Sequence, residues 1–251
     1  MPFSGNTGYY LPDLYKEVDQ AMSELAAGIS HQQIEEAERQ QQALRQQVIT
    51  HDDLPPHVST VAGVDVAYEK DSSRLVAAVA VLDAQTLKVV QVVSHRGETT
   101  FPYVPGLFSF RELPAILKAL EQLAAPPDLI VCDGQGLAHP RRFGLACHLG
   151  VSTGIPTIGC AKTRLTGEYQ TLGETRGSTA ELWDAGEVVG RAVRTQSNIN
   201  PLFVSVGHRV SLQTATDWVL RLAPHYRLPE TTRAADHAVK TLLQANSEPR
   251  D

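Results

Sequence analysis

Apolar residues follow two different spacings along this chain, and the spacing changes near residue 60. Between residues 14 and 25 they recur every three to four positions, as on one face of a helix, and Gly28 then ends the pattern. Ser30 is suited to cap a second helix, rich in Gln and Glu, that extends to about Val48. We therefore predict two helices ahead of the first strand.

Short runs of β-branched and apolar residues replace the helical spacing after this point. They cover residues 60–69, 74–84 and 87–98, and polar residues separate them. The connections are too short to hold a crossover helix, so neighbouring strands must run in opposite directions. This part of the chain predicts an antiparallel meander.

The remainder of the chain alternates between the two patterns. Helical spacing covers residues 109–124, 141–153, 212–222 and 232–244. Strand-like runs cover residues 129–133, 156–160, 187–194 and 202–206. The order indicates an α/β fold with a mixed β-sheet, an antiparallel meander plus parallel strands, flanked by helices. We expect a single domain over residues 31–245 and leave residues 1–30 as an unassigned N-terminal extension.

Composition narrows the class of protein without naming a function. The net charge of −6 and the absence of a long basic run mean that nucleic-acid binding would need a local cationic cleft. Cys132, Cys147 and Cys160 form no CxxC pair and read as buried, reduced thiols, as in a cytosolic protein. The N-terminus lacks a signal-peptide pattern, and the longest apolar run is too short to span a bilayer. We expect a cytoplasmic protein without a membrane segment.

Two aspartates interrupt predicted strands. Asp65 lies in the middle of its strand, where an ionised carboxylate needs a compensating partner, unless an early twist of the strand exposes it. Asp133 ends an apolar run and precedes Gly134-Gln-Gly. Strand ends are where ligands bind in mixed α/β sheets, although an aspartate can also simply open a tight turn there.

Two further acidic residues have equally plain structural interpretations. Ser109 and Glu112 match a capping box, although Pro114 would then leave a helix carbonyl unpaired. Asp236 can pair with Lys240 one helical turn away. Spacing alone does not show whether the acidic residues converge. If they do, they suit Mg²⁺, which prefers oxygen ligands, whereas the chain has no zinc-binding motif.

An unusual loop lies between the meander and the next helix. Two prolines flank Tyr103-Val104, fixing φ on both sides and making a stiff projection. A rigid aromatic tip can stack on bases or fill the gap left by an extruded nucleotide. The alternative is a hydrophobic loop that packs on the protein's own core.

The stretch Phe101-Pro-Tyr-Val-Pro-Gly-Leu-Phe-Ser-Phe-Arg-Glu112 resembles the endonuclease V signature, in which a Pro-Tyr-Ile-Pro loop leads to Leu-Ser-Phe-Arg-Glu. Further segments resemble the same family in unbroken order from about residue 35 to 240: residues 63–67, 133–142, 159–165, 201–209 and 228–236. Gln135 departs from the family, since other members often carry His there.

The resemblance implies an RNase H-like fold and a role for each matching acidic residue. It implies that Asp65, Asp133 and Glu112 bind a metal ion, Mg²⁺ with Mn²⁺ as a substitute, and that Asp236 is a fourth acidic member. It places Lys162 at the scissile phosphate, where a point charge offsets developing negative charge.

The resemblance also implies a nucleic-acid surface. The predicted contacts are Pro102, Tyr103, Val104, Pro105, Gly134, Gln135, Gly136, His139, Arg141, Arg164 and His208. Within this set the Gly134–His139 segment would line the base pocket, and the cationic side chains would follow the phosphates.

The activity implied is that of a monomeric deoxyinosine 3′ endonuclease in DNA repair. It would nick one strand at the second phosphodiester bond 3′ to the lesion, leaving 3′-hydroxyl and 5′-phosphate ends. The alternatives are an inosine-specific ribonuclease, a non-catalytic inosine-binding module, and an ATPase of the actin and sugar-kinase type. The last would use Asp133-Gly-Gln-Gly as a phosphate loop, but the chain is short for two such lobes.

Overall fold

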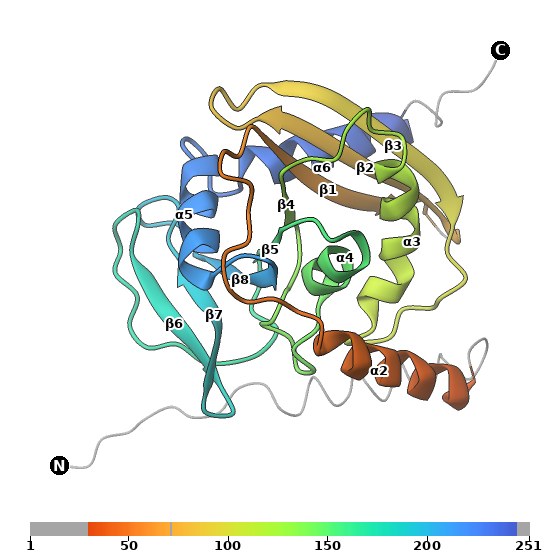
Figure 1. The fold of residues 1–251 in the computed structure, drawn as a ribbon, viewed down its shortest axis with the longest axis horizontal. Helices are drawn as coiled ribbons and strands as arrows, with labels where there is room; N and C mark the ends of the chain where they lie inside the picture. The colour runs from red at the N-terminus through yellow and green to blue at the C-terminus, as the bar shows by residue number, and fades with distance from the viewer. Residues whose placement is uncertain (1–29, 71, 245–251) are drawn as a thin grey trace.

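The computed structural model describes residues 30–70 and 72–244 (Figure 1). Its helices are α2 (His31–Arg45), α3 (Phe108–Leu120), α4 (Leu145–Thr153), α5 (Leu212–Leu222) and α6 (Glu230–Gln244). Its strands are β1 (Thr60–Tyr68), β2 (Arg74–Asp83), β3 (Val89–Glu98), β4 (Leu129–Cys132), β5 (Thr157–Ala161), β6 (Thr179–Asp184), β7 (Glu187–Val193) and β8 (Leu202–His208). The helix predicted around residues 14–25 lies outside the described residues.

One mixed sheet organises the described part of the chain, in the order β3-β2-β1-β4-β5-β8-β7-β6. Strands β3, β2 and β1 are antiparallel neighbours, whereas β4 pairs in parallel with both β1 and β5. Strands β8, β7 and β6 continue the sheet in antiparallel fashion. The predicted meander followed by parallel strands is confirmed, and the fold is the RNase H-like α/β arrangement.

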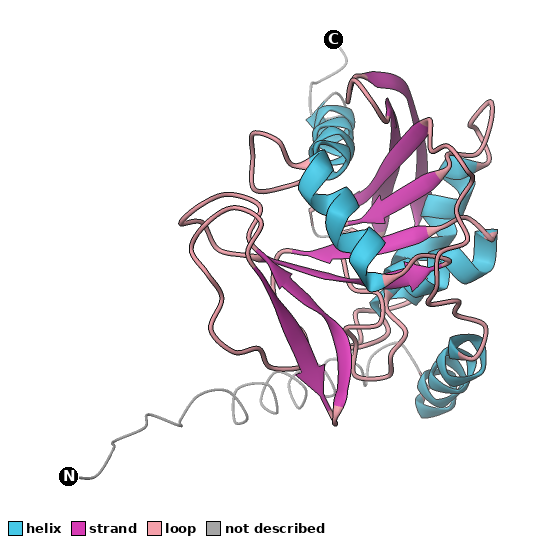
Figure 2. Ribbon diagram, turned by 60° about the vertical axis from the view of Figure 1, so that its left-hand side comes forward, coloured by secondary structure: helices cyan, strands magenta, loops and turns pink. Residues whose placement is uncertain are grey.

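Helices cover both faces of this sheet (Figures 1 and 2). On one face, α3 and α4 bury Ile116 and Leu149 against the strands. On the other, α5 and α6 bury Leu222 and Ala235. Because α3 and α6 pack on opposite faces of β2, that strand is apolar throughout its buried stretch rather than alternating.

The second half of the sheet ends in a hairpin that sequence reasoning missed. No strand was predicted over β6, yet it pairs with β7 across a two-residue turn. Ala185 and Gly186 both have positive φ, at 51° and 81°, as a type I′ turn requires. An alanine is an uncommon choice for that conformation, so the turn lacked its usual sequence signal.

Helix boundaries differ from the predictions for identifiable reasons. The helix cap predicted at Ser30 is confirmed, since its hydroxyl accepts from the Gln33 amide at 3.3 Å, but α2 ends at Arg45 rather than near Val48. The capping box at Ser109 is wrong: α3 begins one residue earlier, and the Ser109 hydroxyl bonds the His148 ring at 3.0 Å. Helix α4 begins at Leu145 rather than 141, because turns occupy the preceding residues.

The three cysteines are buried and free, as predicted. Among the described helices, none is long and apolar enough to cross a membrane.

Candidate functional site

Four carboxylates gather where the central strands end, and we call Asp65, Glu112, Asp133 and Asp236 the acidic edge. Strands β1 and β4 run in parallel, and their last paired residues are Val64 and Cys132. Asp65 and Asp133 each follow directly after these partners, so the strand register places them side by side. The convergence that spacing could not show therefore results from the sheet itself.

The acidic edge carries more negative charge than its surroundings compensate. Burial and the charges of Asp133 and Asp236 together raise the pKa of Asp65 to about 6, against the opposing effects of the Val66 amide and Lys162. Burial likewise raises the pKa of Glu112 to about 8, with Asp65 and Asp133 adding to the effect. A cation at this edge would relieve the repulsion that both shifts express.

Tyr68 holds the most deeply buried of the four acids. Its hydroxyl donates to Oε1 of Glu112 at 3.1 Å, and the Arg111 guanidinium lies 4.6 Å from the centre of its ring. Burial, followed by the charge of Glu112, raises the pKa of Tyr68, so the phenol remains a donor. Sequence reasoning did not identify Tyr68, because its partner comes from a helix 44 residues further on.

Lys162 is the cation of the acidic edge. Its ammonium group contacts Asp133 directly. Burial acts to lower the pKa of Lys162, but Asp133, Asp65 and Asp236 together raise it. Arg227 fixes the backbone here by donating to the carbonyls of Lys162 and Asn200, each at 2.8 Å. Arg227 carried no sequence signal, since its partners are backbone atoms far away along the chain.

Asp236 pairs within its own helix and also lies near the other acids. Its carboxylate accepts from Lys240 at 2.7 Å, which confirms the pairing within the helix. Its charge also acts on Asp65 and Lys162. Helix α6 reaches this position because Gly63 has no side chain: a Cβ there would lie 2.0 Å from the Thr231 carbonyl oxygen. The close approach of β1 and α6 thus brings Asp236 to the acidic edge.

The acidic edge fits a hard divalent cation in its chemistry. Its donors are carboxylate oxygens, which Mg²⁺ prefers, and the raised pKa of Asp65 shows uncompensated charge. Within residues 30–70 and 72–244, no group of three or more His, Cys, Asp or Glu side chains is already arranged as a metal site. Instead, the Lys162 ammonium group forms an ion pair with the Asp133 carboxylate. Asp65, Asp133 and Glu112 are the residues available to hold such an ion.

The loop of residues 101–107, which we call the PYVP loop, combines both interpretations weighed for it. Tyr103 is 61% exposed and meets Phe108 edge to face, with ring centroids 6.4 Å apart. Val104, in contrast, is only 7% exposed and packs against Ala37 and Leu107. The Val104 side chain, predicted to contact nucleic acid, therefore packs inside the protein instead. The Tyr103 ring projects into solvent.

Several other predicted contacts are turned inward. His139 is buried, and burial lowers its pKa to about 4, which leaves the ring uncharged at neutral pH. His208 is also buried, and its Nδ1 accepts from the Ile49 amide at 3.2 Å. Gly136 lies against β8, where a Cβ would be 2.0 Å from the Val206 carbonyl oxygen. These three residues are therefore buried rather than exposed at the surface.

The remaining predicted contacts differ in exposure. Pro105 and Arg164 are exposed and Pro102 is half-buried, whereas Arg141 is engaged by neighbouring groups. Gly134 has room above it, with Leu145 atoms 3.8 Å from a notional Cβ. Gln135 donates to the Thr163 carbonyl at 3.0 Å, and its own side-chain oxygen has no hydrogen-bond partner.

Comparison with known proteins gives a consistent result. A family model described as Endonuclease V matches residues 42–237. Endonuclease V of Nocardia farcinica is 54% identical over 211 residues, which cover 84% of this chain and 93% of that protein. The solved structure of endonuclease V from Streptomyces avermitilis is 53% identical, with a TM-score of 0.81 over 85% of this chain and 94% of that one.

A more distant relative has been solved with nucleic acid. Endonuclease V of Ciona intestinalis, in complex with a 23mer DNA containing an inosine followed by a ribo-adenosine, is 27% identical. Its TM-score is 0.77, and the match covers 87% of this chain and 100% of that one. The matched model and the two relatives above half identity show that this chain belongs to the endonuclease V family, whose members are endonucleases and hence hydrolases.

Proposed function

We propose that this chain nicks one strand of inosine-containing DNA at the second phosphodiester bond 3′ to the deoxyinosine, using Mg²⁺ and leaving 3′-hydroxyl and 5′-phosphate ends. The observation that carries the proposal is the acidic edge, where Asp65 and Asp133 lie in adjacent register beside Lys162. An uncompensated cluster of carboxylates with one lysine suits phosphodiester hydrolysis. The complex of the Ciona intestinalis relative supports inosine as the target.

The side chains divide the work of hydrolysis. Water attacks the phosphorus while the bond to the 3′ oxygen breaks, and that oxygen takes up a proton. A magnesium ion held by Asp65, Asp133 and Glu112 would stabilise the attacking and departing oxygens. Lys162 opposes the charge that builds on the phosphate. Tyr68 keeps Glu112 turned toward the other acids through its 3.1 Å hydrogen bond.

Asp236 is the acid best placed to accept a proton from the attacking water. It lines a hollow of about 510 Å³ together with Tyr226, Arg233 and Lys240. The Arg233 guanidinium lies over the Tyr226 ring, 3.3 Å from its centre. This aromatic and cationic surface gives a single strand a place to lie beside the acidic edge.

Selection of the damaged base falls to the exposed ring of Tyr103 and to the loop that follows β4. An inserted aromatic ring can occupy the space left when a nucleotide leaves the helix. Hypoxanthine carries an oxygen where adenine has an amine, so a donor in the pocket separates the two bases. Gly134, where a notional Cβ would meet only Leu145 atoms at 3.8 Å, belongs to the segment assigned this role.

The test uses end-labelled strands that carry one inosine, in DNA and in RNA, with and without Mg²⁺. We expect a Mg²⁺-dependent nick at the second phosphodiester bond 3′ to the inosine. We also expect the DNA strand to be cut faster than the RNA strand. Faster cutting of RNA would reassign the enzyme to the ribonuclease alternative. Tight binding without cleavage in either metal, Mg²⁺ or Mn²⁺, would instead show a binding module.

A further inference from the structure

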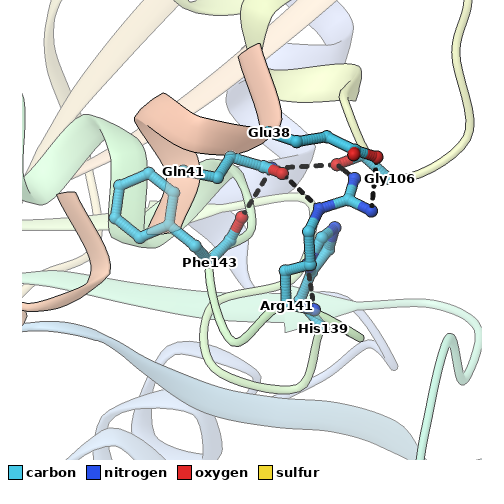
Figure 3. A network of polar contacts seen from close by, with 6 residues as sticks. All are labelled: Glu38, Gln41, Gly106, His139, Arg141 and Phe143. Atoms are coloured by element: carbon cyan, nitrogen blue, oxygen red, sulfur yellow. Dashed lines mark hydrogen bonds and ion pairs between the residues drawn. The ribbon is translucent and has the colours of Figure 1, made fainter. Parts of the chain in front are cut away.

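Helix α2 reaches the PYVP loop through one buried glutamine (Figure 3). Nε2 of Gln41 donates to the Gly106 carbonyl at 2.8 Å and to the Phe143 carbonyl at 3.1 Å. Oε1 of Gln41 accepts from Nε of Arg141 at 2.5 Å. One side chain therefore joins three segments: α2, the PYVP loop and the loop between β4 and α4.

Arg141 completes the junction from the other side. Its Nη2 donates to the same Gly106 carbonyl at 2.7 Å, and its Nη1 lies 3.2 Å from the Glu38 carboxylate (Figure 3). All three guanidinium nitrogens thus face groups of this chain, and Glu38 offsets the charge. These contacts compete with a phosphate for Arg141.

The junction demands glycine at position 106. Gly106 has a φ of 78°, in the left-handed region, and a Cβ would lie 2.5 Å from Nη2 of Arg141. Gly106 is three residues beyond Tyr103, so its carbonyl anchors the C-terminal side of the projecting ring. With two donors on one carbonyl, the loop has little freedom to shift.

Apolar packing reinforces the same contact. Ala37, one helical turn before Gln41, is buried against Val104 and Leu107, and Ile34 packs at the edge of this cluster. Gln41 itself is 1% exposed, and each polar atom of its amide has a partner. A buried amide that loses its partners is costly, so the arrangement has one stable geometry.

We propose that α2 is a brace for the PYVP loop, in which Gln41 and Arg141 are positioning residues that hold Tyr103 at the height needed to recognise the damaged base. Arg141 then acts on the loop and not on the phosphates of the substrate. Gln41 and Glu38 precede residue 42, where the match to the family model begins, so they lie outside that match. The effect of the brace on recognition of the damaged base rests on the proposed function. The brace itself rests on the contacts of α2 with the PYVP loop.

The first readout needs no substrate. Amide hydrogen exchange at residues 103–107 should speed up about tenfold or more in Gln41→Ala, because the loop loses the Gln41–Gly106 hydrogen bond and Arg141 loses the acceptor that orients it. Gln40→Ala is the matched control, since Gln40 is exposed on the same helix and bonds only Glu36, at 3.3 Å. Unchanged exchange in Gln41→Ala would overturn the brace.

The second readout connects the brace to Tyr103. In single-turnover cleavage of inosine DNA, Gln41→Ala should raise the half-saturating DNA concentration about tenfold while the maximal rate changes little, and the effect should vanish in a Tyr103→Ala background. Additive effects would contradict action through the loop. If Gln41→Ala does not fold, Gln41→Glu serves instead, since it keeps the acceptor for Arg141 and loses both donors.

The third readout decides the role of Arg141. A phosphate contact predicts that Arg141→Ala lowers the slope of log affinity against log salt by about one, whereas a positioning residue leaves the slope unchanged. A lowered slope would return Arg141 to the phosphate track. A wild-type protein that ignores inosine, yet shows faster loop exchange in Gln41→Ala, would refute the proposed function and leave the brace standing.

Discussion

The PYVP loop leads directly into α3, which carries Glu112 of the acidic edge, but the two regions are held in place by different means. Strand register forces Asp65 and Asp133 together, and the pKa of Asp65 is raised by burial and then by the charge of Asp133. The PYVP loop is held by hydrogen bonds from Gln41 and Arg141 to the Gly106 carbonyl and by the burial of Val104. The acidic edge carries negative charge that a cation would compensate, whereas the PYVP loop has its hydrogen bonds and packing contacts in place before any substrate binds.

This difference teaches that the two regions have separable tasks. Groups whose interactions are completed only during the reaction accelerate it, whereas pre-organised groups set affinity and selection. We therefore expect changes at the acidic edge to act on the rate and changes at the loop to act on recognition. Substitutions in each region test whether rate and recognition are separable in this way.

The largest effect should come from Asp65→Asn. We expect the cleavage rate to fall about 10³-fold or more, comparable with the loss of other groups that act on the transition state. Stability at pH 7 should rise instead, by up to about 3 kcal/mol, because the substitution removes a buried charge whose pKa is raised from 3.8 to about 6. Denaturant unfolding and single-turnover cleavage measure the two quantities.

Asp217→Asn is the matched control for this prediction, since Asp217 is exposed on α5 and is bonded by Gln213 at 3.0 Å. It should change neither rate nor stability. An Asp65→Asn protein that is both inactive and markedly less stable would mean that Asp65 serves the fold, and the contrast between the two regions would collapse.

Tyr103→Ala should have the next largest effect, on recognition alone. Loss of one stacked aromatic ring costs about 1–3 kcal/mol, so affinity for inosine DNA should fall about 5- to 150-fold. Tyr103→Phe should restore most of it, because the ring rather than the hydroxyl does the work. Titration by fluorescence anisotropy gives both affinities, and equal binding by all three proteins would remove Tyr103 from the interface.

The smallest effect, per pH unit, sets Asp65 of the acidic edge against His148, a buried residue of α4 whose ring bonds the Ser109 hydroxyl of α3. Burial lowers the pKa of His148 to about 4, so the unfolded chain, with a pKa near 6.5, binds more protons between these values. Stability therefore gains from His148 as pH rises from about 4 to 6.5, by at most about 1.4 kcal/mol per pH unit. Asp65 has the opposite sign, since its raised pKa makes stability fall as pH rises from 3.8 to about 6.

The two contributions oppose each other in the wild type, and substitution should expose them. Asp65→Asn should tilt the stability profile upward with pH, and His148→Gln should tilt it downward, as measured by urea unfolding from pH 4 to 7. Parallel profiles for the two variants would show that neither group titrates with a shifted pKa.

The sequence predicted the strands and their order well, because β-branched runs and short connections constrain a meander directly. It left the acidic residues ambiguous, since only the β1–β4 register joins Asp65 to Asp133. It gave no sign of charge partners that are far away along the chain: Arg142 pairs with Asp184 at 2.7 Å and with Glu187 at 2.6 Å, both from the hairpin that was partly missed. Local sequence patterns do not encode such distant partners. For the same reason the sequence did not indicate that the His208 side chain is buried.

The most direct test measures binding and cleavage separately on one duplex, carrying either inosine or adenine, for wild type, Asp65→Asn and Tyr103→Ala. The account predicts that Asp65→Asn still prefers the inosine duplex but does not cut it, while Tyr103→Ala loses much of the preference and cuts at a near-normal maximal rate once saturated. If Asp65→Asn lost its preference for inosine, or Tyr103→Ala lost its maximal rate, the division between a reacting edge and a recognising loop would be contradicted.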